Sequence, residues 1–125
     1  MKVLLVEDNF LNQKVVTFHL KKKNYDVVST DNGPDAMKIV ENEDVDLILM
    51  DIMLPGMNGF EITAEIRKYE KNQDVKHPVP IIAVTANTLD NDREKCLNAG
   101  MDEYLPKPFN AQDLYRVIEE CIASA

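Results

Sequence analysis

The run Val45-Asp46-Leu47-Ile48-Leu49-Met50 is short and mostly apolar, and it ends directly before the acidic residue Asp51. A continuous apolar stretch of this length is typical of a strand buried on both faces of a parallel sheet. Four more short apolar runs cover residues 3–6, 25–29, 80–84 and 103–105, and those at 3–6 and 80–84 are continuous in the same way. The sequence therefore predicts five short strands.

Segments with helical spacing lie between these runs. The residues that share one helical face are Leu11, Val15 and Phe18; Ala36, Ile39 and Val40; Phe60, Ile62, Ile66 and Tyr69; and Leu114, Val117, Ile118 and Cys121. Pro34 suits a first helical position, Asn110 suits a helix N-cap, and Gly100 suits a helix end. A further helix, with few apolar anchors, is expected over residues 88–98. Strands that alternate with helices need crossover connections, which predict a parallel sheet with helices on both faces.

The length and charge of the chain narrow its function. Its 125 residues suit one domain, which we expect to fill positions 1–125 without an output domain. The net charge of −8 disfavours direct binding to nucleic acid or to an anionic membrane surface. No apolar run could span a bilayer, and no signal peptide is recognisable. Cys96 and Cys121 fit core positions in a reducing compartment, so we expect a cytoplasmic protein.

Chemically active residues follow the strands. Glu7 and Asp8 come after the first strand, Asp51 after the third, Thr85 after the fourth and Lys107 after the fifth. Ligands of open parallel sheets bind beyond the carboxyl ends of the strands, so these side chains are predicted to gather at one edge.

Each of these residues also has an ordinary structural explanation. Asp8 and Thr85 could cap helices, Asp51 could stabilise a turn, and Lys107 could be a solvated surface residue. A structural role does not explain why Glu7, Asp8 and Asp51 should be crowded together, because like charges repel. A bound Mg²⁺ would offset that repulsion and suits oxygen ligands.

Together these residues resemble a known family. The stretches that carry the resemblance are Val6-Glu7-Asp8-Asn9, Leu49-Met50-Asp51-Ile52-Met53-Leu54-Pro55-Gly56-Met57-Asn58-Gly59, Val84-Thr85-Ala86 and Tyr104-Leu105-Pro106-Lys107-Pro108-Phe109. In order and interval they are similar to the receiver domain of two-component response regulators. The opening through Gln13 is most similar to receivers of hybrid histidine kinases and single-domain relay regulators.

The resemblance implies a flavodoxin-like (CheY-like) α/β fold, with a five-stranded parallel sheet in the order 2-1-3-4-5 flanked by five helices. It implies that Asp51 accepts a phosphoryl group from a histidine kinase or a histidine phosphotransfer protein. Glu7, Asp8, Asp51 and the backbone carbonyl of Met53 would hold Mg²⁺, for which Mn²⁺ can substitute.

The resemblance also assigns the phosphoryl contacts and the switch. Lys107, Thr85 and the backbone N–H of Ala86 would bind the phosphoryl group, and the Lys107–Pro108 bond is expected to be cis. Thr85 would move toward the phosphoryl group, and Tyr104 would turn inward. Partner binding would then change on the face formed by the fourth helix, fifth strand and fifth helix.

The resemblance further implies a signalling switch that catalyses its own phosphorylation and dephosphorylation, rather than a turnover enzyme. Its downstream partner would be an effector protein or a further relay module, and the chain would be a monomer or a weak dimer.

Two further residues bear on the lifetime of the phosphoryl group. Met53 and Asn87 lie two positions beyond Asp51 and Thr85 and would flank the path of the hydrolytic water. Because Met53 is apolar and Asn87 is a poor base, we expect a persistent phosphoprotein. His19 and His77 are expected to have no chemical role.

Three other functions remain open. A hydrolase of the haloacid dehalogenase type also uses an aspartyl phosphate, but it carries an acid two positions after the nucleophile, where this chain has Met53. A nucleotide- or flavin-binding domain would need a phosphate loop in place of Glu7-Asp8-Asn9. A receiver that acts only as an interaction scaffold would not need the full set of site residues.

Overall fold

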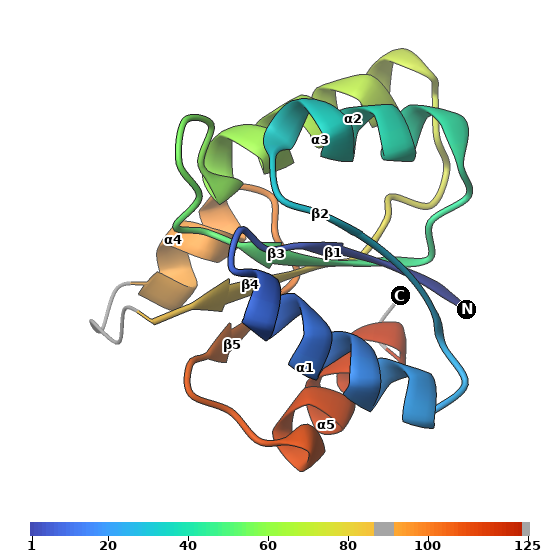
Figure 1. Ribbon diagram of the computed structural model, residues 1–125. Helices are drawn as coiled ribbons and strands as arrows, with labels where there is room; N and C mark the ends of the chain where they lie inside the picture. Colours follow the sequence, from blue (N-terminus) through green and yellow to red (C-terminus); the bar gives the residue numbers. More distant parts are fainter. Residues whose placement is uncertain (87–91, 124–125) are drawn as a thin grey trace.

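The computed structural model describes residues 1–86 and 92–123, and these form a five-stranded parallel sheet (Figure 1). The strands are β1 (Lys2–Val6), β2 (Asp26–Thr30), β3 (Leu47–Asp51), β4 (Ile81–Thr85) and β5 (Glu103–Pro106). Their spatial order is β2-β1-β3-β4-β5, which confirms the fold predicted from the sequence. Val6 lies opposite Met50 in the β1–β3 pair, so the two strands end side by side.

Helices cover both faces of the sheet. They are α1 (Phe10–Lys22), α2 (Gly33–Asn42), α3 (Gly59–Asn72), α4 (Asp92–Asn98) and α5 (Ala111–Ala123). Figure 1 shows α1 and α5 on one face and α2 and α3 on the other. The helix expected over residues 88–98 corresponds to α4, and residues 88–91 lie outside the described part of the chain.

The sheet separates two apolar cores. The core under α1 and α5 includes Leu5, Leu49, Val84, Leu114 and Ile118. The core under α2 and α3 includes Leu4, Ile48, Ile62, Ile66 and Ile81, and also Cys96 from α4. Cys96 and Cys121 are both buried, as expected for core cysteines.

The apolar face that identifies α1 in the sequence does not pack on the sheet. Leu11, Val15 and Phe18 are 69%, 48% and 58% exposed, whereas Val16 and Leu20 are buried. The apolar spacing therefore predicts the helix correctly but not the face that it buries. Leu11, Val15 and Phe18 therefore form an exposed apolar surface on α1, and exposed apolar surfaces of this kind can mark an interaction site.

The first residues of α1 and α3 position these helices next to the carboxyl ends of β1 and β3. Asn9 caps α1 by accepting a hydrogen bond from the backbone N–H of Asn12 at 3.0 Å. The first residue of α3, Gly59, packs closely against the backbone of Asp51 at the end of β3. A Cβ atom at position 59 would lie only 2.7 Å from the carbonyl oxygen of Asp51. A larger residue at position 59 would push α3 away from Asp51. Among the described residues, no helix is long and apolar enough to cross a membrane.

Candidate functional site

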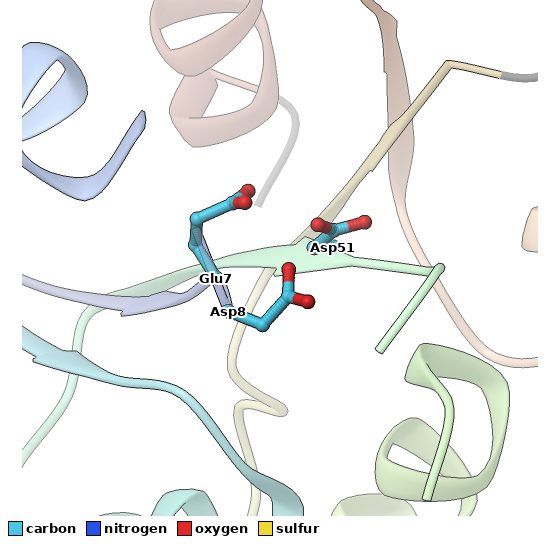
Figure 2. Close-up of side chains that lie close together, drawn as sticks. All are labelled: Glu7, Asp8 and Asp51. Atoms are coloured by element: carbon cyan, nitrogen blue, oxygen red, sulfur yellow. The ribbon is translucent and has the colours of Figure 1, made fainter. Parts of the chain in front are cut away.

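Three carboxylates meet at the carboxyl ends of β1 and β3. Figure 2 shows Glu7 and Asp8, which follow β1, beside Asp51, the last residue of β3. Each offers an oxygen atom, and these atoms all lie within 4.8 Å of one another. Glu7 and Asp51 are each only 4% exposed, whereas Asp8 is exposed to solvent.

Lys107 brings a positive charge to this cluster from the loop between β5 and α5. Its Nζ lies 3.1 Å from Oε2 of Glu7 and 3.3 Å from Oδ2 of Asp51. Its backbone N–H donates to the carbonyl oxygen of Thr85 at 2.7 Å, which ties the loop to the end of β4. The Lys107–Pro108 peptide bond is cis.

Local hydrogen bonds hold the two buried carboxylates in place. Oδ1 of Asp51 accepts from the backbone N–H of Met53 at 2.9 Å. Oε1 of Glu7 accepts from the backbone N–H of Asn9 at 3.2 Å and from Nδ2 of Asn12 at 3.4 Å. These donors orient the oxygen atoms without neutralising their charge, so the cluster stays acidic.

The environment shifts the protonation of two groups in the site. Burial raises the pKa of Glu7 above its usual value of 4.5, and the negative charge of Asp51 raises it further. Burial acts to lower the pKa of Lys107, but the charges of Asp51 and Glu7 outweigh this and raise it above 10.5. The Lys107 ammonium therefore keeps its charge at neutral pH.

The donor set fits a hard divalent cation. All three acidic residues present carboxylate oxygens, which Mg²⁺ prefers, and among the described residues no sulfur or imidazole ligand joins this cluster. Three carboxylates against the one ammonium of Lys107 leave a formal charge of about −2, which a divalent cation would balance.

The structure describes all of the remaining predicted site residues except Asn87. Thr85 ends β4 and is 1% exposed. Tyr104 is half-buried and packs against the core under α2 and α3. The Met53 side chain is 68% exposed, Ala86 is exposed, and Asn87 lies outside the described residues.

Two features of the site are not predicted from the sequence. Gln13 donates from Nε2 to the carbonyl oxygens of Glu7 and Thr30, and so links α1 to the ends of β1 and β2. A cleft of 410 Å³ also opens beside the carboxylates, between α1 and the loop that precedes α5. The polar residues of the first turn of α1 could have suggested the Gln13 contact. The cleft depends on how side chains from separate elements pack, and no local pattern encodes it.

Comparison with known proteins identifies relatives along nearly the whole chain. The family model described as the response regulator receiver domain matches residues 3–119. Hybrid signal transduction histidine kinase B of Dictyostelium discoideum is 42% identical over 120 residues, which are 90% of this chain but 6% of that protein. Sensor histidine kinase GacS of Pseudomonas protegens is 36% identical over 117 residues, 94% of this chain and 13% of its own length. The chain thus spans a small part of these relatives.

Solved structures agree with the fold. The receiver domain of a sensor histidine kinase from Pseudomonas aeruginosa, with a magnesium ion in its active-site cleft, is 43% identical with a TM-score of 0.84 and covers 98% of this chain and 97% of that one. A chain in the co-crystal structure of the Saccharomyces cerevisiae phosphotransfer protein Ypd1 with the Ssk1 receiver domain is 33% identical, with a TM-score of 0.90. It covers 100% of this chain and 91% of that one.

Proposed function

Because the chain belongs to the response regulator receiver domain family of two-component signal transduction, we propose that Asp51 accepts a phosphoryl group from a phosphohistidine. The observation that carries this assignment is the placement of Asp51. It is a buried carboxylate at the end of the central strand, within reach of two further carboxylates and of Lys107. Glu7 is buried equally and also contacts Lys107, but its other oxygen accepts from two donors, whereas among the described residues the other oxygen of Asp51 accepts from one.

The transfer needs little covalent chemistry from the protein. An Asp51 oxygen would attack phosphorus as the phosphorus–nitrogen bond to the donor histidine breaks, and the imidazole leaves with the electron pair of that bond. Positioning and neutralisation of charge do most of the work in such transfers. Glu7, Asp8, Asp51 and the backbone carbonyl of Met53 would hold a Mg²⁺ ion, which would supply part of that neutralisation.

Side chains on the other strands would complete the phosphoryl site. The Lys107 ammonium already contacts Asp51 and would pair with a phosphoryl oxygen after transfer. The Thr85 hydroxyl and the backbone N–H of Ala86 lie at the end of the neighbouring strand β4 and would donate to the remaining oxygens. Movement of Thr85 would then change the packing of Tyr104 and the face made by α4, β5 and α5.

The exposed face of α1 would receive the phosphodonor. Leu11, Val15 and Phe18 form an apolar surface on the helix that begins two residues after Asp8. Lysines flank it, with Nζ of Lys14 4.6 Å from the ring centroid of Phe10 and Nζ of Lys22 5.3 Å from that of Phe18. No acidic residue lies between positions 10 and 23. This charge pattern fits an apolar donor surface with an acidic rim, such as a histidine phosphotransfer protein could present.

The donor surface can be tested separately from the chemistry. Leu11→Glu should slow transfer from a phosphorylated histidine phosphotransfer protein much more than it slows labelling by acetyl phosphate. Val75→Glu is the matched control, since Val75 is also exposed but lies in the loop before β4. If Leu11→Glu slows labelling by both donors equally, or if Val75→Glu slows transfer as much as Leu11→Glu does, α1 is not the docking surface.

The metal site can be tested without any phosphoryl donor. Mg²⁺ should raise the melting temperature of the unmodified protein by mass action, and Mn²⁺ should do the same. Asp8→Asn should reduce the gain, because it removes one ligand and one negative charge. A melting temperature that millimolar Mg²⁺ leaves unchanged would contradict the proposed site.

A further inference from the structure

The 410 Å³ cleft beside the carboxylates is mainly apolar. Its floor is formed by sheet residues on the α1 and α5 side, namely Leu5, Leu49 and Val84. Val16 and His19 of α1 form one wall, and Phe109 from the loop before α5 forms the other. This volume lies within the range of about 300–1,000 Å³ that is typical of small-molecule sites.

One end of the cleft is polar and carries net negative charge. Glu7, Asp51 and Lys107 line that end, and Asn12 stands beside them. The Lys107 ammonium is already engaged by both carboxylates, at 3.1 Å and 3.3 Å. The exposed carboxylate of Asp8 lies within the same cluster. A ligand head group at this end would therefore face more negative than positive charge.

We propose that this cleft is a binding site for a compact apolar amine. The hydrocarbon part of the ligand contacts Leu49, Val16 and Phe109, and its ammonium group faces the carboxylates of Glu7 and Asp51. An anionic head group would be repelled, and a neutral one would gain no charge interaction. The amine would occupy the space beside Asp51 and would exclude a divalent cation from the cluster.

This inference does not depend on phosphorylation of Asp51. It requires only the apolar cleft and the charges at its polar end, both of which are present in the unmodified protein. If the amine does not bind, the proposed phosphoryl transfer to Asp51 is unaffected. If Asp51 is not phosphorylated, the proposed amine site is likewise unaffected.

Three probes with one hydrocarbon skeleton separate charge from apolar contact. They are 4-phenylbutylamine, 4-phenylbutanol and 4-phenylbutyrate, titrated into the ¹⁵N-labelled protein and followed by NMR. The amine should bind saturably and shift the amide signals of Val16, His19, Val84 and Phe109. It should bind about tenfold more tightly than the alcohol, as expected for one charge interaction near a protein surface, and the carboxylate should bind more weakly than the alcohol. Saturating Mg²⁺ should weaken binding of the amine.

Two pairs of variants locate the ligand. Glu7→Gln keeps the shape of the side chain but removes its charge, so the affinity for the amine should fall towards that for the alcohol. Glu43→Gln is the control, because Glu43 forms a surface ion pair with Lys2, and it should leave the affinity unchanged. Val16→Phe should fill the cleft and abolish binding. If Val16→Phe does not fold, Val15→Phe on the exposed rim replaces it, with Val75→Phe as its control.

Three results would overturn the proposal. They are equal affinities for the amine and the carboxylate, amide shifts that map outside the cleft, and the absence of saturable binding by the amine.

Discussion

Nζ of Lys107 lies 3.3 Å from Oδ2 of Asp51, although 56 residues separate the two in the chain. The same nitrogen lies 3.1 Å from Oε2 of Glu7, so one ammonium bridges two buried carboxylates that come from different strands. The site is electrostatically strained, because the bridge offsets only part of the negative charge of the three carboxylates.

Lys107→Met should lower the free energy of unfolding when no divalent cation is present. The change leaves Glu7 and Asp51 buried without their counter-charge. Breaking a fully buried pair costs roughly 3–5 kcal/mol, but the Lys107 side chain is 24% exposed, so we expect about 2 kcal/mol. Urea unfolding at pH 7 measures this loss, and Mg²⁺ should restore more stability to the variant than to the original protein.

Lys2→Met is the control for that prediction. Lys2 pairs with Glu43 at 2.8 Å on the surface, where ion pairs contribute little. If the two variants lose equal stability, the Lys107 bridge has no special energetic role.

Glu7→Gln should change the pH dependence of stability. Burial and the charge of Asp51 raise the pKa of Glu7 above 4.5, so the folded protein binds this proton more tightly than the unfolded chain does. The stability that protonated Glu7 contributes is fully present below pH 4.5 and is lost as the pH rises through the raised pKa of the folded state. The stability of the original protein relative to Glu7→Gln should therefore fall across that window when no divalent cation is present. Parallel curves for the two proteins would show that Glu7 ionises in the folded state as it does in the unfolded chain.

Thr85→Val should separate phosphoryl transfer from the switch. The hydroxyl is not the nucleophile, so labelling of Asp51 should persist, while the NMR shifts that phosphorylation causes in α4 (Asp92–Asn98) should shrink. Tyr104→Phe should have a smaller effect, because the ring remains.

Thr63→Val is the matched control for Thr85→Val. Thr63 is a buried threonine of α3, and its hydroxyl has no hydrogen-bond partner among the described residues, so its loss should not destabilise the protein. Full shifts in α4 with Thr85→Val would exclude Thr85 from the switch.

By our expectation from the sequence, the lifetime of the phosphoryl group should depend on the side chains at positions 53 and 87, of which the structure describes only Met53. Met53 is 68% exposed beside the site, where an apolar side chain offers the hydrolytic water no hydrogen bond. We therefore expect slow loss of phosphate and faster loss when Met53→Asn is combined with Asn87→Glu. First-order decay of the labelled proteins measures this, and unchanged or slower decay in the double variant would mean that these side chains do not guard the path.

The fold and most of the site follow from local patterns. Continuous apolar runs identify β1, β3 and β4, and parallel strands place their carboxyl ends at one edge. That rule is enough to bring Glu7, Asp51 and Lys107 together without any knowledge of side-chain positions.

Other features depend on packing that local patterns do not contain. Val16 and Leu20 are four residues apart, as are Leu11 and Val15, so periodicity alone cannot decide which pair of α1 faces the sheet. The cleft likewise needs α1 and the loop around Phe109 to stand at a particular separation, which is a tertiary property.

Chemical mapping of the phosphorylated residue tests the central claim most directly. The protein is labelled by a phosphorylated histidine phosphotransfer protein with Mg²⁺, the acyl phosphate is reduced with borohydride, and the peptides are sequenced by mass spectrometry. Reduction converts a phosphorylated aspartate to homoserine, so our account predicts homoserine at position 51 alone, none after chelation of the metal, and none in Asp51→Asn. Homoserine at position 8, or full labelling of Asp51→Asn, would contradict it.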